Sequence, residues 1–125
     1  MFAREALRID IANYERHVAE PNPVFFERGV LDALGSLHAV APLSDDEIER
    51  WIAKYRYFPK VLVLPPWPEI YVTDAERDHT FEHAQWVDRV TRDWYRRCGY
   101  RVVEVPTAPV EERCELVLRE IDRVD

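Results

Sequence analysis

The segment from Lys60 to Tyr71 constrains the fold of this chain more than any other stretch. It opens with residues 61–64, Val-Leu-Val-Leu, a short continuous apolar run that is typical of a strand covered on both faces. Pro65 and Pro66 follow at once, and because proline has no amide proton to donate, strand pairing must end there. An open α/β sheet usually places its ligand site where a buried strand runs into such a loop.

Two further short runs predict strands, at about 24–27 and 102–105, and each lies next to a proline. The segments before, between and after the strands carry apolar residues at helical spacing: 2–19, 30–40, 45–57, 74–98 and 110–121. Strands that alternate with helices favour a parallel sheet with right-handed crossovers. We therefore predict one α/β domain over residues 1–125, with short parallel strands at about 24–27, 61–64 and 102–105.

Local signals predict where several helices begin and end. Ser44 to Glu47 and Thr73 to Glu76 are capping boxes, and the second is expected to open the longest helix. Gly99 suits a left-handed helix end, and Pro109 suits a first helical turn. The residues expected to face inward include Leu7, Ile11, Tyr14 and Val18 in the first helix, Phe81, Ala84, Val87, Val90 or Thr91, Trp94 and Cys98 in the longest, and Val110, Cys114, Val117, Leu118 and Ile121 in the last.

Charge and composition exclude several classes of protein. The 125 residues carry a net charge of −7, which disfavours nucleic-acid binding and anionic membranes, and no apolar run approaches membrane-spanning length. Cys98 and Cys114 lack metal-ligand spacing, so we expect reduced core thiols and a cytoplasmic protein. His79 and His83 could share a zinc ion at i,i+4 spacing, but without a third ligand nearby a solvated face is expected instead.

A series of motifs runs along the chain with ordinary spacings. The first is Phe-Phe-Glu-Arg-Gly at 25–29, and the most specific is Leu-Val-Leu-Pro-Pro-Trp-Pro-Glu-Ile-Tyr at 62–71. Shorter matches lie at 74–77, 81–82, 99–100, 103–106 and 110–113. Together they resemble the NadR-like group of predicted bacterial AAA-type ATPases, which are kinase-like P-loop NTPases. The resemblance implies a three-layer P-loop NTPase-like fold that uses ATP and Mg²⁺.

The phosphate loop of that family is missing from this sequence. Its glycines, Gly29, Gly35 and Gly99, form no G-x-x-x-x-G-K-[ST] motif. The resemblance therefore implies a truncated domain that begins after the loop, with little or no nucleotide hydrolysis of its own. Met1 lying within a predicted helix fits this expectation. A misassigned start codon or a frameshift, with the loop encoded upstream, is the simplest alternative.

The resemblance also implies a gap in the sheet. The family's first strand lies between those matching 24–27 and 61–64, so a partner chain or a homo-oligomer is expected to complete the sheet unless the two strands pair directly. A non-catalytic interaction module is thus the alternative function.

The resemblance gives candidate roles to three residues near the end of the first predicted strand. Glu27 matches the acidic position that orients Mg²⁺ through water or acts as base toward an acceptor hydroxyl. Arg28 matches an arginine that contacts acceptor or phosphate, and Asp32 could share the metal or bind substrate. The alternatives are a pair with Arg28 or a cap of the following helix for Glu27, a surface salt bridge for Arg28 and a helix cap for Asp32.

The loop after the second predicted strand supplies the remaining candidates. Arg77 matches a lid arginine that closes over nucleotide phosphates, although an exposed ion-pair partner is the alternative. Trp67 and Tyr71 could stack on a base or an acceptor ring, or else cover their own core. Glu69 could bind substrate, or hold the loop by accepting backbone amides.

Overall fold

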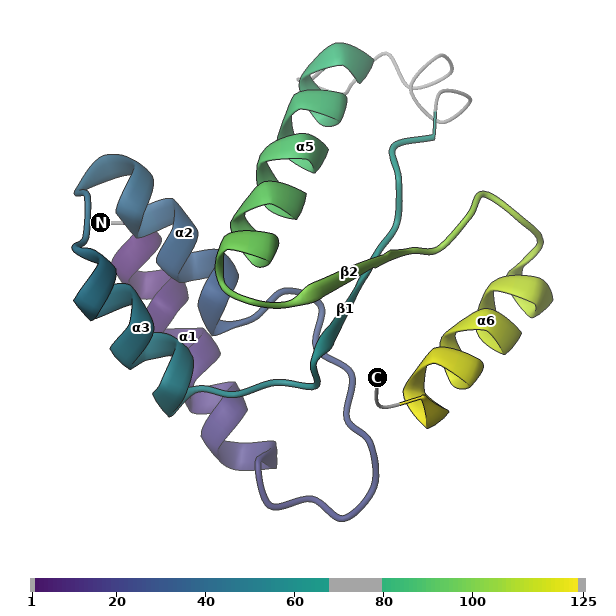
Figure 1. Cartoon of the computed structure of the whole chain (residues 1–125), viewed down its shortest axis with the longest axis horizontal. Helices are drawn as coiled ribbons and strands as arrows, with labels where there is room; N and C mark the ends of the chain where they lie inside the picture. The colour runs from purple at the N-terminus through teal and green to yellow at the C-terminus, as the bar shows by residue number, and fades with distance from the viewer. Residues whose placement is uncertain (1, 68–79, 124–125) are drawn as a thin grey trace. The chain divides into compact units, whose positions relative to one another are not determined.

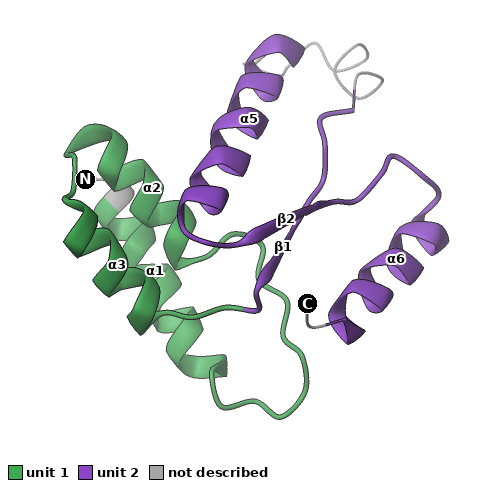
Figure 2. Cartoon of the chain, in the orientation of Figure 1, with its two compact units in different colours: residues 1–57 green, residues 58–125 purple. Residues whose placement is uncertain are grey.

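The computed structural model describes residues 2–67 and 80–123, and within these ranges the chain forms an α/β structure (Figure 1). Its helices are α1 (Phe2–His17), α2 (Val30–Val40), α3 (Asp45–Lys54), α5 (Phe81–Arg97) and α6 (Val110–Asp122), and its strands are β1 (Lys60–Val63) and β2 (Arg101–Glu104). The chain divides into two compact units, Met1–Tyr57 and Phe58–Asp125 (Figure 2). None of the described helices is long and apolar enough to span a bilayer.

The first unit is built from α1, α2 and α3 around a small core. Leu7, Val30, Ala33 and Tyr55 form its buried cluster, so α1, α2 and the residue that caps the end of α3 contribute. The prediction of α2 over 30–40 is confirmed, as is the Ser44 capping box, in which the Ser44 hydroxyl accepts the Glu47 amide at 3.2 Å. Leu7, Ile11 and Tyr14 face this core as predicted, whereas Val18 lies past the end of α1 and is exposed.

A chain of aromatic rings crosses the first unit. Neighbouring ring centroids lie between 5.2 and 6.1 Å apart, at the separations that aromatic pairs favour. In order, the rings are Trp51, Tyr55, Tyr14, Tyr57, Phe26 and His17. This chain connects α3 and the residues after it to α1 and to the segment that precedes α2.

Tyr57 also links this chain of rings to the start of α2, through its hydroxyl. The Val30 amide donates to the Tyr57 hydroxyl oxygen at 2.9 Å, which satisfies a donor that a helix N-terminus otherwise leaves unpaired. A Cβ atom on Gly29 would lie 2.7 Å from the same oxygen. Only glycine therefore fits at position 29 without displacing the tyrosine.

The predicted strand at 24–27 is wrong. These residues run in irregular conformation between α1 and α2, and Phe25 is 62% exposed rather than buried. A strand needs a neighbour to accept and donate its backbone hydrogen bonds, and β1 pairs with β2 instead. Pro23, directly before this segment, has no amide proton to extend such pairing toward α1.

The second unit contains the two strands, which pair in parallel as predicted. Val61 lies opposite Val102 and Val63 opposite Glu104, so β1 and β2 sit within one residue of the predicted 61–64 and 102–105. Hydrogen bonds extend the ladder at both ends, from the Arg101 amide to the Pro59 carbonyl and from the Val105 amide to the Val63 carbonyl. A three-layer arrangement stays a prediction.

Helix α5 has well-defined ends. It begins at Phe81, where the Thr80 hydroxyl accepts the His83 amide at 3.1 Å, so the expected start at Thr73 is wrong for this helix. The capping box predicted there lies outside the described residues. At the other end Gly99 adopts φ 92° as predicted, and the Tyr100 amide donates to the Tyr95 carbonyl at 3.0 Å. Of the two residues predicted as alternatives for the inner face of this helix, Thr91 is half-buried and Val90 is exposed.

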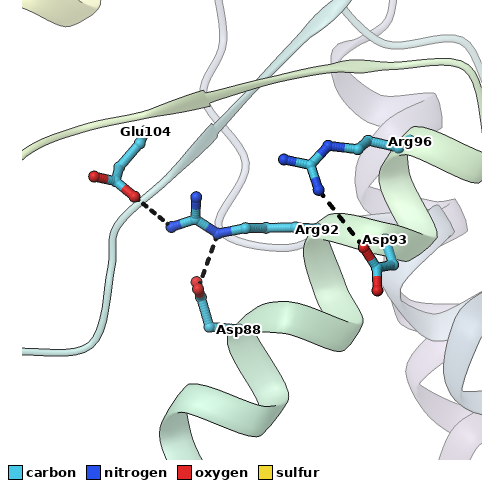
Figure 3. Close-up of polar contacts among 5 residues, drawn as sticks. All are labelled: Asp88, Arg92, Asp93, Arg96 and Glu104. Atoms are coloured by element: carbon cyan, nitrogen blue, oxygen red, sulfur yellow. Dashed lines mark hydrogen bonds and ion pairs between the residues drawn. The ribbon is translucent and has the colours of Figure 1, made fainter.

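Two groups of ion pairs attach helices to the sheet. Arg92 on α5 donates to Asp88 at 2.9 Å and to Glu104 on β2 at 2.8 Å, while Arg96 pairs with Asp93 at 3.6 Å (Figure 3). Burial alone would lower the pKa of Arg92, but its hydrogen bonds to the two carboxylates raise it.

The second attachment joins β1 to α6. The Lys60 side chain is 2% exposed, and its ammonium donates to the Glu120 carboxylate at 3.0 Å and to the Glu120 carbonyl at 3.2 Å. The hydrogen bond from Lys60 lowers the pKa of the Glu120 carboxyl. Each strand therefore binds a neighbouring helix through one charged residue, Lys60 on β1 and Glu104 on β2.

The predicted inner face of α6 is partly wrong. Val117 and Ile121 are half-buried as expected, but Val110, Cys114 and Leu118 are exposed, and no residue of this helix is fully buried. The covered positions are Arg113, Leu116, Val117, Glu120 and Ile121. The inward face thus carries charged residues that pair with groups elsewhere in the unit, a pattern that an apolar count does not detect. Cys98 is buried, as predicted.

Replacing Tyr57 by Phe is expected to cost about 1–3 kcal/mol of unfolding free energy, because the Val30 amide loses its partner in a buried setting. Gly29→Ala is expected to cost a similar amount through overpacking against the hydroxyl. Unfolding in urea, followed by circular dichroism, measures both variants and the double variant. The double variant should lose less unfolding free energy than the two single losses added together, by more than about 0.5 kcal/mol.

Tyr14→Phe is the matched control for that cycle. It also removes a hydroxyl, which donates to the Arg56 carbonyl at 3.0 Å, but it leaves the space beside Gly29 unchanged. Its cost should add to that of Gly29→Ala within about 0.5 kcal/mol. Equal coupling in both cycles would contradict the role assigned to the Tyr57 hydroxyl.

The ion pair between β1 and α6 predicts unequal costs for its two members. Glu120→Gln leaves a buried ammonium without its counter-charge, whereas Lys60→Met leaves a carboxylate that is 21% exposed, so Glu120→Gln should destabilise more. The folded-state pKa of Glu120 is lowered, so its contribution is present at neutral pH and is lost as pH falls through that pKa. Unfolding measured from neutral to acid pH should show the gap between wild type and Glu120→Gln closing.

Candidate functional site

A hollow of about 270 Å³ lies within the first unit, between α1 and the segment that leads into α2. The α1 residues that line it are Asp10, Asn13 and His17, and the segment supplies Val24, Phe25, Phe26, Glu27 and Arg28. Glu27 and Arg28 were expected to mark a site from the sequence. The structure brings both of them to this hollow.

The three α1 residues were not predicted as site residues. Asp10, Asn13 and His17 are spaced by three and four, so they share one face of the helix. The segment 24–28 folds back across that face, and the Phe26 ring packs 6.1 Å from the His17 ring. A polar stripe beside the apolar stripe of α1 was the available signal, but solvent-exposed helix faces carry such stripes as well.

Asp10 has the most perturbed electrostatics in the hollow. Burial raises the pKa of the Asp10 carboxyl, the nearby charge of Asp32 raises it further, and Arg28 opposes the shift only in part. The negative field at Asp10 therefore exceeds what Arg28 can neutralise. Asp10, Arg28 and Asp32 form one coupled group of charges beside the hollow.

The backbone at the start of α2 positions Arg28 and Asp32. Arg28 adopts φ 66°, the left-handed conformation that side chains other than glycine rarely take. Asp32 accepts the Gly29 amide at 2.9 Å, so its carboxylate caps α2, the alternative that the sequence left open. Asp32 thus acts on the hollow through its charge on Asp10, and it is not a lining residue.

The described residues contain no group of three or more His, Cys, Asp or Glu side chains that could hold a metal ion. Glu27 as a water-mediated Mg²⁺ contact therefore stays a prediction. Of the histidines considered for zinc, His83 packs its ring 5.9 Å from Trp86 on α5, and His79 lies outside the described residues.

The second unit places Trp67 against an arginine that sequence reasoning did not single out. The Arg113 guanidinium, on the first turns of α6, lies 5.7 Å from the centre of the Trp67 ring, a cation–π distance. The Arg113 Nε atom is buried and has no hydrogen-bond partner among the residues that the structure describes. Along the sequence Trp67 follows β1 and Arg113 follows β2, and parallel sheets bind ligands beyond the carboxyl ends of their strands. Glu69, Tyr71 and Arg77 lie outside the described residues.

Asp10→Asn is expected to stabilise the protein at neutral pH. The folded-state pKa of Asp10 is raised, so the folded protein binds this proton more tightly than the unfolded chain does. This contribution to stability is fully present at low pH and is lost as pH rises through the folded-state pKa. Thermal unfolding should show the variant above wild type at pH 7, with the difference vanishing toward pH 3. Glu15→Gln, on the opposite, exposed face of α1, should leave stability unchanged, and an equal gain there would contradict the account.

A comparison with known protein families finds a match over most of the chain. A family model described as an AAA domain matches residues 1–113. No curated protein matches the chain, and no solved structure matches it. Because the family model covers nine-tenths of the sequence, from α1 into the first turns of α6, the chain belongs to the AAA domain family, which is of the P-loop NTPase type.

Proposed function

We propose that this chain is a NadR-like, kinase-like member of its AAA domain family, and that its 125 residues correspond to the part of the domain that follows the phosphate loop. The observation that carries the proposal is the family match over residues 1–113 in a sequence without a phosphate-loop motif. The residues after its three glycines are Val30, Ser36 and Tyr100, so no glycine precedes a lysine. The chain alone then has little or no ATPase or phosphoryl-transfer activity.

The proposal gives the candidate residues of each unit a separate role toward a nucleotide or its acceptor. Glu27 and Arg28, beside the hollow of the first unit, are the acceptor-side groups, with Asp32 as the residue that caps α2 and sets the local charge. Trp67, with Arg113 against its ring, offers an aromatic face to a nucleobase or acceptor ring. Arg77 is assigned to a lid, and Glu69 and Tyr71 to the loop beside it.

The residues of this chain do not by themselves fit Mg²⁺ and ATP. Most of the grip on nucleotide phosphates comes from loop amides and a loop lysine, and a loop serine or threonine holds the metal. Lys60, one of the two lysines in the sequence, is buried and paired with Glu120. The chain alone therefore lacks the loop groups on which phosphoryl transfer depends.

Isothermal titration of the purified chain with Mg-ATP should give no micromolar binding, and a phosphate-release assay should give no turnover above that of Glu27→Gln. Micromolar affinity, or turnover that Glu27→Gln abolishes, would overturn the proposal. Reading the DNA upstream of the Met1 codon for an in-frame phosphate-loop motif separates a truncated protein from a misassigned start.

A second candidate function is a non-catalytic interaction module that pairs with itself or with a partner chain. The observation that favours it is the two-stranded sheet of the described residues, since two strands alone are marginal and their outer edges leave backbone groups unpaired. Leu64, directly after β1, is 63% exposed. Size-exclusion chromatography with light scattering tests this directly, and a stable monomer at high concentration would count against it.

A further inference from the structure

The hollow of the first unit combines two kinds of group that together recognise positive charge. Asp10 and Glu27 bring carboxylates to it, and Phe25, Phe26 and His17 bring aromatic rings. Carboxylates neutralise a cation, and aromatic faces attract it through the ring quadrupole. We propose that this hollow binds a small organic cation, of the amidinium, guanidinium or alkylammonium class.

The charge balance of the hollow favours a cation over an anion. Its lining contains two carboxylates and one guanidinium, and the carboxylate of Asp32 lies close enough to act on Asp10. Arg28 could attract an anion, but its effect on Asp10 is smaller than the opposing effects of burial and Asp32. The local field is therefore negative at Asp10, and an incoming cation relieves repulsion that the free protein carries.

The aromatic side of the hollow is available to a ligand. Phe25 is 62% exposed although it lines the hollow, whereas Phe26 is held by ring contacts at 5.7 Å to Tyr57 and 6.1 Å to His17. Phe26 thus packs against two other rings, whereas Phe25 presents much of its side chain to solvent. Asn13 adds an amide oxygen that accepts an N–H donor from the ligand.

Size limits the class of ligand further. At about 270 Å³ the hollow is smaller than the pockets of roughly 300–1,000 Å³ that enclose drug-sized molecules. A compact cation of one ring or one short chain fits this volume. Since the hollow is open to solvent, its electrostatic contribution is partly screened and weak binding is expected.

This inference goes beyond the proposed function and does not depend on it. The hollow lies wholly within residues 10–28 of the first unit, and a cation can bind there whether or not any nucleotide binds the chain. Micromolar binding of Mg-ATP would overturn the proposed function and leave this inference standing, and a negative result with cations would leave the proposed function standing.

Three probes of the same shape and different charge provide the test. Benzamidinium, benzamide and benzoate are titrated into the ¹⁵N-labelled full chain at pH 7.5 and low ionic strength, with amide shifts followed by NMR. We expect benzamidinium to bind about tenfold more tightly than benzamide, and benzoate to bind least, with the largest shifts at Asp10, Asn13 and Phe26. Equal affinities, a preference for benzoate, or shifts centred elsewhere would overturn the inference.

Two variants that each remove one carboxylate test whether the preference for a cation arises in the hollow. Asp10→Asn keeps the shape of the side chain and is expected to abolish the tenfold preference while the chain stays folded. Glu15→Gln removes the same charge from the opposite face of α1, so it keeps the overall change in net charge but should leave the preference intact. If the two variants lose the preference equally, the effect is one of net charge, and the site is not the hollow.

Discussion

The hydrogen bond from the Val30 amide to the Tyr57 hydroxyl is the contact on which the first unit depends. It joins the start of α2 to a tyrosine 27 residues later, and the lack of a side chain at Gly29 is what lets the hydroxyl approach. The Tyr57 ring in turn packs against Tyr14 and Phe26. A change at position 29 or 57 would thus move α2, the segment that precedes it and the hollow together.

Charge pairs attach helices of the second unit to its two strands. Helix α6 has no fully buried residue, and its attachment to β1 runs through the enclosed Lys60–Glu120 pair. On the other strand, Glu104 of β2 binds Arg92 of α5. Buried pairs contribute less to net stability than apolar packing, but breaking one is costly, so they fix which surfaces meet. The sheet is therefore held to its helices by specific partners.

Local sequence signals were sufficient for the elements whose ends depend on neighbouring residues. The bounds of α2, the Ser44 capping box and the left-handed Gly99 were all predicted, as were β1 and β2 to within one residue and their parallel orientation. The strand at 24–27 was wrong because strand formation depends on a distant hydrogen-bonding neighbour, which a local pattern does not contain. The same limit explains α6, whose inward face carries the charges of Arg113 and Glu120, and their partners lie elsewhere in the unit.

The residues of the candidate site also divide into those that the sequence predicts and those that only the folded chain reveals. Glu27 and Arg28 could be found from a motif, whereas Asp10, Asn13 and His17 became site residues only once the chain folded back over α1. Asp10 lies where burial and Asp32 both disfavour its charge, which costs stability in the free protein. A residue that opposes stability while lining a hollow is expected where function, and not folding, sets the residue type.

Hydrogen exchange of the Val30 amide measures the anchoring contact most directly. This amide is the first in α2 and has no acceptor within the helix, and among the described residues it donates its hydrogen bond to the Tyr57 hydroxyl. The account predicts slow exchange in wild type and fast exchange in Tyr57→Phe, with the amides of α3 little changed. Fast exchange of Val30 in wild type, or unchanged slow exchange in the variant, would contradict it.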